Sequence, residues 1–246
     1  MNAKPAYVVS DIHLGAVPEV TERAFRRFLR HIADHGSELL INGDLFDFWF
    51  EYGSVIEGKH FRVLAALAEL REAGVPVRFV GGNHDAWGGA FLRDHAGLEL
   101  LDEGTERLIG GRTALVVHGD GVGAGDLGYR VLKRVIRNPV SITLFRALHP
   151  GLGVRLASRV SKTGTKHGTP GQVNHGRAKE LREWAVGELE RRPGVNLVLA
   201  GHIHQPVVEE VFPDRFYVNT GDWINHFTYL TLTPGEAPVL SRWNRE

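Results

Sequence analysis

The fold of this chain is decided by the stretch Leu40-Ile41-Asn42-Gly43-Asp44-Leu45-Phe46-Asp47. Its apolar beginning is typical of a buried strand, and the run stops abruptly at a glycine followed by an acid. Such a strand delivers one carboxylate to the end of a sheet. Because a buried carboxylate is costly unless it is paired, hydrogen-bonded or bound to a metal, Asp44 must find partners elsewhere in the sequence.

Four other segments repeat this design, an apolar strand that ends in a turn carrying His, Asp or Asn. In open α/β sheets, ligands gather at the carboxyl ends of the strands, so five such ends can meet in one cleft. Imidazole together with carboxylate favours Mn, Fe, Zn or Co over Ca and Mg. Each segment alone is compatible with an ordinary turn, but all five in order predict a metal site. The four are Val8-Val9-Ser10-Asp11-Ile12-His13, Val80-Gly81-Gly82-Asn83-His84-Asp85, Val116-Val117-His118-Gly119-Asp120 and Leu199-Ala200-Gly201-His202-Ile203-His204.

The composition is that of an ordinary globular protein. Hydrophobic residues make up 43% and charged residues 24% of the 246 positions, and the formal net charge is zero, so no overall field indicates a nucleic-acid partner. The chain has no cysteine, which excludes disulfides and thiolate metal sites and fits a reducing cytoplasm. We expect the N-terminus to run directly into a strand without a signal segment, and no apolar run is long enough to span a membrane.

Strands and helices alternate in the first half of the chain, which predicts right-handed crossovers and a largely parallel sheet. Short strands after residue 81 predict a second sheet packed on the first. We therefore expect an α/β fold, a four-layer αββα sandwich that forms one domain over residues 1–246. The expected strands are 6–10, 38–42, 75–80, 98–101, 106–109, 113–118, 196–201, 207–212, 216–220, 227–232 and 238–243, with a hairpin turn at 110–111; the expected helices are 21–35, 60–73 and 172–191.

The segment from about residue 121 to 171 fits neither sheet and predicts an inserted helical lid. Three short amphipathic helices are expected in it, at 128–136, 140–148 and 152–160. Between residues 126 and 166, nine basic residues stand against one acid. A basic, amphipathic insertion suits a ligand with an anionic head and an apolar tail, or the surface of an anionic membrane. The alternative is that these helices only pack on the sandwich and expose a solvated basic face. Nucleic acid is disfavoured because aromatic residues for base stacking are sparse.

The ordered motifs resemble those of the calcineurin-like metallophosphoesterase superfamily over nearly the whole chain. The resemblance implies hydrolysis of phosphate esters or anhydrides with two divalent ions, which polarise phosphoryl oxygens and activate water. Mn²⁺ is the expected ion, with Fe, Zn or Co as alternatives. The implied ligands are Asp11, His13, Asp44 and His204 for the first ion, and Asp44, Asn83, His118 and His202 for the second.

Two further residues take catalytic roles by the same resemblance. His84 matches a superfamily histidine that contacts phosphate and protonates the leaving oxygen. Asp85 is expected to orient His84. Both lie in the same turn as Asn83.

A closer likeness narrows the substrate. The segments 45–50, 118–126, 128–129 and 148–150 are similar to those of the UDP-2,3-diacylglucosamine diphosphatase family of lipid A synthesis. This implies cleavage of a UDP-linked diacyl sugar to UMP and 2,3-diacylglucosamine 1-phosphate, peripherally at the cytoplasmic face of the inner membrane, with no nucleic acid and no obligate protein partner. The substrate contacts implied are Asn83, His84, Asp126, Ser161, Lys162, Lys166 and His202.

One departure keeps other readings open. The best-known branch of that family has arginine after the motif asparagine, where this chain has His84. A metal-dependent phosphodiesterase or phosphatase with another nucleotide or lipid substrate is the alternative. A metal-free scaffolding relative is a more remote one.

Overall fold

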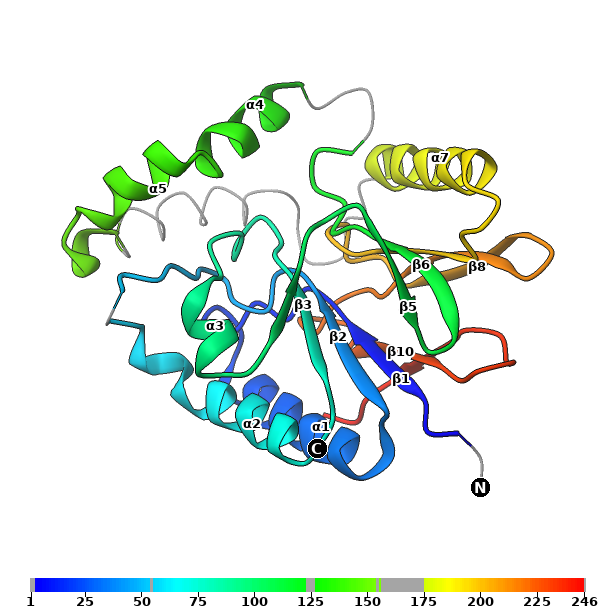
Figure 1. Ribbon diagram of the computed structural model, residues 1–246, viewed down its shortest axis with the longest axis horizontal. Helices are drawn as coiled ribbons and strands as arrows, with labels where there is room; N and C mark the ends of the chain where they lie inside the picture. The colour runs from blue at the N-terminus through cyan, green and yellow to red at the C-terminus, as the bar shows by residue number, and fades with distance from the viewer. Residues whose placement is uncertain (1–2, 54, 123–126, 154, 156–174, 246) are drawn as a thin grey trace.

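The structure is a computed structural model that describes residues 3–53, 55–122, 127–153, 155 and 175–245. Eleven strands form two sheets in the described chain, and helices lie outside them (Figure 1). The strands are β1 (Ala6–Val9), β2 (Glu38–Asn42), β3 (Val77–Val80), β4 (Glu99–Leu101), β5 (Thr105–Ile109), β6 (Arg112–Val116), β7 (Leu197–Ala200), β8 (Val207–Phe212), β9 (Arg215–Asn219), β10 (Thr228–Leu232) and β11 (Val239–Arg242). The helices are α1 (Glu19–His35), the 3₁₀ helix η1 (Gly58–His60), α2 (Phe61–Glu72), α3 (Ala90–Asp94), α4 (Leu127–Ile136), α5 (Pro139–Arg146) and α7 (His175–Arg191).

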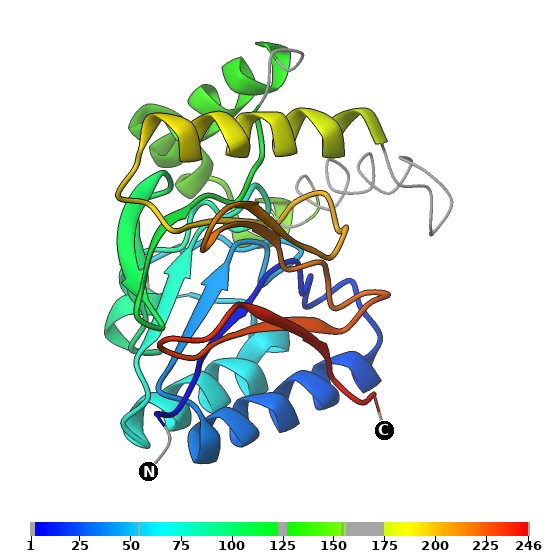
Figure 2. The same cartoon turned by 90° about the vertical axis from the view of Figure 1, so that its right-hand side faces the viewer.

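Side-chain alternation along the strands builds three apolar cores between four layers. Tyr7 of β1 faces α1 and packs with Phe28. Its neighbour Val8 points to the opposite face of the sheet and packs between the two sheets, in the same core as Leu199 of β7. The outer face of the second sheet is covered by α7, whose Leu181 lies in the third core. Figure 2 shows α1 and α2 on one side and α7 on the other. The expected αββα sandwich is confirmed.

The strand order brings the polar turns together along the line where the strand ends of the two sheets meet, the seam. The first sheet has the order β11-β10-β1-β2-β3-β4, and the second β5-β6-β7-β9-β8. The neighbours β1, β2 and β3 are parallel, as are β6, β7 and β9. The Asn42 side chain at the end of β2 donates to the carbonyl oxygen of Val117 after β6, at 2.8 Å. The carboxyl ends of the two parallel sets therefore meet directly.

The observed helices and strands are of the types that the sequence predicts, but several of them begin or end at other residues than predicted. The turn between β5 and β6 is the expected hairpin, with φ of 54° at Gly110 and 82° at Gly111. Helices α4 and α5 match the first two expected helices of the lid. Of the third, residues 152, 153 and 155 are helical and the rest lies outside the described residues. The sequence did not indicate η1 or α3. No helix in the described chain is long and apolar enough to cross a membrane.

Candidate metal centre

All seven expected metal ligands follow strands that end at the seam. Asp11 and His13 come after β1, Asp44 after β2 and Asn83 after β3, while His118 follows β6 and His202 and His204 follow β7. Three overlapping groups place their ligand atoms within 4.8 Å of one another. These groups are Asp11 with His13 and His204, His13 with Asp44 and His84, and Asp44 with His118 and His202. The arrangement could hold more than one ion.

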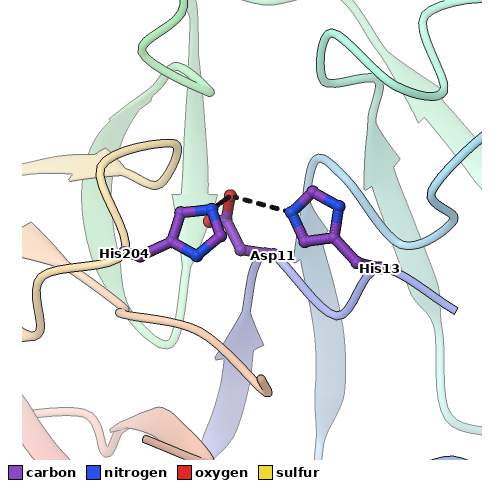
Figure 3. A group of neighbouring side chains, drawn as sticks. All are labelled: Asp11, His13 and His204. Carbon is purple, nitrogen blue, oxygen red and sulfur yellow. Dashed lines mark ion pairs between the residues drawn. The ribbon is translucent and has the colours of Figure 1, made fainter. Parts of the chain in front are cut away.

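The distances within the groups are short enough for the side chains to bind one cation together. Asp11 Oδ1 lies 3.3 Å from His204 Nε2 and 3.9 Å from His13 Nε2 (Figure 3). Asp44 Oδ2 lies 3.8 Å from His13 Nε2 and 3.2 Å from His118 Nε2. Two atoms that each lie about 2.1 Å from one ion are roughly 3–4 Å apart. Asp44 thus stands between a group around Asp11 and a group around His118.

Unpartnered buried atoms provide an independent test of whether ions fit here. Among the described residues, no hydrogen bond reaches the buried atoms His13 Nε2, Asn83 Oδ1 and His118 Nε2, and the carboxylates nearest the two imidazole nitrogens lie 3.2–3.9 Å away. His118 Nδ1 lies 2.9 Å from the carbonyl oxygen of Asn42, so in the neutral ring Nδ1–H donates and Nε2 keeps its lone pair. Leaving such atoms without a partner costs about 1–3 kcal/mol each. All three can donate a lone pair to a divalent cation, so the residues fit the expected ions.

Backbone strain is concentrated in the same residues. Asp11, His13, Asp44, His202 and His204 have φ between 51° and 67°, in the left-handed region. They are five of the seven non-glycine residues of the described chain with positive φ. This conformation costs an L-residue about 1–2 kcal/mol. Strain that gathers at one cluster indicates a functional constraint on the turns.

Two glycines allow the turns to approach one another. A Cβ atom at Gly82 would lie 2.2 Å from Asp44 Oδ1, and one at Gly43 would lie 2.2 Å from His118 Nδ1. Gly43 also has a φ of 85°. Both glycines permit sharp turns, and they also make room for the side chains of neighbouring candidate ligands.

The predicted pairing of Asp85 with His84 is wrong. The buried Asp85 carboxylate accepts backbone N–H groups of Gly82 at 2.8 Å, Asp44 at 3.1 Å and Phe46 at 3.2 Å. His84 Nδ1 lies instead 2.7 Å from the carbonyl oxygen of Asp47 and 3.7 Å from its carboxylate. The tight turn directs the Asp85 side chain back into the backbone. Asp85 therefore fixes the two turns relative to each other, and Asp47 orients His84.

The cluster shifts the pKa values of its members in opposite directions. Burial alone would raise the pKa of Asp44, but the imidazole of His118 beside it holds that pKa well below its usual range. Burial and the charge of Asp44 together raise the pKa of Asp85 to about 6. Burial would lower the pKa of His204, but the carboxylates of Asp11 and Asp222 raise it to about 9. Imidazole protons compete with metal ions for the same lone pairs, so ion binding must release protons.

Sequence reasoning missed Asp222, a fully buried residue beside the cluster. Its Oδ2 lies 3.6 Å from His204 Nδ1 and 2.7 Å from His226 Nδ1. Its Oδ1 accepts the N–H groups of Ile224 and Asn225 at 2.7 and 2.6 Å. A carboxylate at this place holds Nδ1 of His204 and leaves Nε2 directed towards Asp11. The signal was present, because the apolar run Phe216-Tyr217-Val218 is followed at positions 221 and 222 by Gly-Asp.

Basic residues of the lid have two different environments. Lys133 of α4 and Arg137, the residue after α4, turn inwards, where Lys133 Nζ lies 2.7 Å from Glu103 Oε2 and Arg137 Nη2 lies 3.3 Å from the carbonyl oxygen of Gly81. Arg134 of the same helix is exposed. The substrate contacts expected at Asp126, Ser161, Lys162 and Lys166 lie outside the described residues.

Apolar residues of the lid are divided in the same way. Phe145 of α5 packs inwards on Phe50 and Trp87, with ring centroids 4.7 and 5.0 Å apart. In the part of the lid that the structure describes, six large apolar side chains are instead 38–66% exposed. They are Val131, Val135, Val140, Leu144, Leu148 and Leu152.

Comparison with known proteins agrees with the fold and the motifs. A family model described as calcineurin-like phosphoesterase matches residues 4–206. A protein of Porphyromonas gingivalis (strain ATCC BAA-308 / W83) named UDP-2,3-diacylglucosamine hydrolase is 30% identical over 240 residues, which cover 91% of this chain and 92% of that protein. A protein of the same name from Serratia proteamaculans (strain 568) is 31% identical over 203 residues, 82% of this chain and 83% of the relative. The solved structure of a dimetal phosphatase from Danio rerio aligns over 100% of this chain and 98% of its own, with 13% identity and a TM-score of 0.49. The family model and the two relatives show that this chain belongs to the calcineurin-like phosphoesterase family and is a hydrolase.

Proposed function

We propose that this chain hydrolyses the pyrophosphate bond of UDP-2,3-diacylglucosamine and releases UMP and 2,3-diacylglucosamine 1-phosphate. The observation that carries the substrate is the likeness to a relative of that name over 91% of this chain. A likeness of this extent includes the lid as well as the motifs at the strand ends. The ions are proposed to be two Mn²⁺, with Fe, Zn or Co as alternatives that use the same donors.

The proposed ligand sets share one carboxylate. Asp11, His13 and His204 would hold the first ion, Asn83, His118 and His202 the second, and Asp44 both. When bound, two such ions draw electron density from phosphoryl oxygens and make a water molecule more acidic. Asp44 lies within 4 Å of imidazoles from both sets, His13 at 3.8 Å and His118 at 3.2 Å, which supports its shared role.

His84 is proposed to contact the phosphoryl group and to give a proton to the leaving oxygen. Its Nδ1 is held by the carbonyl oxygen of Asp47 at 2.7 Å, so the ring keeps a fixed orientation and Nε2 is available to a substrate. The side chain is 21% exposed, enough for a substrate to reach it from solvent. A positioned general acid contributes about 10²–10⁴-fold to the rate. Asp85 supports this role indirectly by holding the turn that carries His84.

The lid, residues 121–171 within a single domain of residues 1–246, is proposed to receive the acyl chains. Four polar residues of the lid that lie outside the described residues are proposed to bind the sugar and phosphate, together with Asn83, His84 and His202. They are Asp126, Ser161, Lys162 and Lys166. We also propose peripheral binding to the cytoplasmic face of the inner membrane, because the six exposed apolar residues of the lid lie among basic ones. Apolar side chains flanked by cations suit an anionic lipid surface.

A product assay tests the substrate. Purified protein is incubated with Mn²⁺ and UDP-2,3-diacylglucosamine, and the products are identified by mass spectrometry. UMP and 2,3-diacylglucosamine 1-phosphate in equal amounts are expected. Bis(p-nitrophenyl) phosphate serves as the comparison, because rapid cleavage of this small diester with none of the UDP-lipid would refute the proposed substrate and favour another phosphodiesterase. A chain that binds no divalent ion and shows no chelator-sensitive activity would be a scaffolding relative.

A further inference from the structure

Glu103 links the lid to the second ligand set. It lies in the turn between β4 and β5, where the chain passes from the first sheet to the second. Its Oε1 accepts the backbone N–H of His118 at 3.2 Å. Its Oε2 lies 2.7 Å from Nζ of Lys133 on α4 and 3.5 Å from Nη1 of Arg137, which directly follows that helix. One carboxylate thus joins the backbone of a candidate ligand to a lid helix.

Lys133 makes a second connection to the same turn. Its ammonium group lies 3.0 Å from the carbonyl oxygen of Asp120 and 3.0 Å from Asp120 Oδ2. The side chains of Glu103, Asp120 and Lys133 are only 15%, 1% and 19% exposed. The positive charge of Lys133 therefore lies beside two largely buried carboxylates. One of them, Glu103, accepts the backbone N–H of His118, and the other, Asp120, follows His118 by two residues. Without the charge of Lys133, the carboxylates of Glu103 and Asp120 would repel each other, and both would lose a hydrogen-bond donor.

The C-terminal end of α4 is attached to the turn of Asn83. Arg137 Nη2 donates to the carbonyl oxygen of Gly81 at 3.3 Å. Trp87 Nε1 donates to the carbonyl oxygen of Ile136 at 2.9 Å. Gly81 precedes Asn83 by two residues, and Trp87 follows it by four. A single helix of the lid thus reaches the turns of both Asn83 and His118, which belong to the second ligand set and not to the first.

We propose that Glu103 and Lys133 are positioning residues that hold the His118 turn in place while α4 is docked, so that docking of α4 and affinity for the second ion are coupled. This inference rests on the two-ion function proposed above. Coupling of this kind is reciprocal: the docked helix strengthens the second ion's binding, and the second ion stabilises the docked helix by the same factor. The first ion, held by Asp11, His13 and His204 together with Asp44, is expected to be affected much less.

Titration of metal-stripped protein with Mn²⁺ alone tests the proposal, with isothermal calorimetry as the readout. In Lys133→Met, one of two binding events should weaken by about 10–100-fold, the range for loss of a group that supports a ligand, and the other should change little. Glu103→Gln should act in the same way. Arg134→Met is the matched control, because it removes the same charge from an exposed position of the same helix. Lys133→Arg retains the cation and should recover most of the affinity.

Hydrogen exchange gives a readout that a merely structural role would not change. In the wild type, saturating Mn²⁺ should slow amide exchange in α4, and this protection should be smaller in Lys133→Met. If Lys133→Met binds both ions as Arg134→Met does, or if Mn²⁺ leaves exchange in α4 unchanged, the coupling is refuted. Two bound ions with the expected pattern but no cleavage of the UDP-lipid would leave the coupling intact and refute only the proposed substrate. Fewer than two ions per wild-type chain would refute both the coupling and the two-ion function on which it rests.

Discussion

Gly82 is the position at which one added methyl group should test the geometry of the candidate centre. A Cβ atom there would lie 2.2 Å from Asp44 Oδ1, 2.7 Å from its backbone nitrogen and 2.8 Å from its Cγ. The φ of Gly82 lies outside the left-handed region, so an L-residue can adopt it. The effect of Gly82→Ala should therefore arise from the contact with Asp44 and not from backbone strain at position 82.

The size of the effect follows from these contacts. A carbon and an oxygen in ordinary contact lie about 3.5 Å apart, so the Asp44 carboxylate or the turn of Gly82 must shift by about an ångström. A displacement of about 1 Å in a catalytic arrangement can lower the rate by about 10²-fold, which equals about 2.7 kcal/mol in activation free energy. Because Asp44 is proposed to contact both ions, the loss should include metal affinity.

The measurements are kcat/KM with saturating Mn²⁺, metal content by mass spectrometry and the thermal unfolding midpoint. Gly194→Ala is the matched control, because a Cβ atom at Gly194 meets nothing within 4 Å and the residue does not have a positive φ. We expect Gly82→Ala to lose about 10²-fold in kcat/KM while remaining folded, and Gly194→Ala to behave as the wild type. Wild-type kcat/KM in folded Gly82→Ala would refute the packing of this turn against Asp44.

Three other predictions concern single side chains. Asp44→Ala should abolish activity and reduce the metal content of the purified protein, and retention of more than about a tenth of the wild-type rate would contradict a carboxylate shared by two ions. His84→Ala should lower kcat by about 10²–10⁴-fold with metal content unchanged, whereas loss of metal would make His84 a ligand. Burial lowers the pKa of His60 to about 3 from its ordinary 6.5. Below pH 6.5 the unfolded chain therefore takes up a proton at His60 that the folded chain does not. The free energy of unfolding consequently falls as the pH falls towards 3. In urea titrations, His60→Leu should lose less unfolding free energy on acidification than the wild type, by at most about 1.4 kcal/mol per pH unit in this window, and equal pH slopes would argue against an uncharged His60 in the folded state.

Strand ends were predictable from sequence because apolar runs stop abruptly at them. Asp44 and the other expected ligands could be identified in this way, and the structure brings their carboxylates and imidazoles together. Asp222 has the same local pattern, but its importance depends on β9 lying parallel beside β7. That pairing is a property of the strand order, which hydrophobic periodicity does not contain. His204 therefore gained a partner that only the fold could show.

Side-chain direction was harder to predict than position. Asp85 follows His84 in the sequence, but the turn directs its carboxylate to the N–H groups of Gly82, Asp44 and Phe46. The short helix α3 was missed because its support comes from another loop, where the Glu51 carboxylate accepts the N–H of Phe91 at 2.9 Å. In the lid, Lys133 and Arg134 are adjacent and carry the same charge, and it is the contact with Glu103 that distinguishes Lys133.

The position of the centre on the seam between the sheets has a consequence for how the protein is made. His202 donates its backbone N–H to the Asp11 carboxylate, and the two residues are 191 positions apart in the chain. A ribosome must therefore have synthesised most of the polypeptide before either of the proposed ligand sets is complete. An ion bound afterwards would close a loop of nearly the full chain length, in the manner of a long-range cross-link that restricts the unfolded state. An ion at this centre would therefore stabilise chains whose two sheets have already joined.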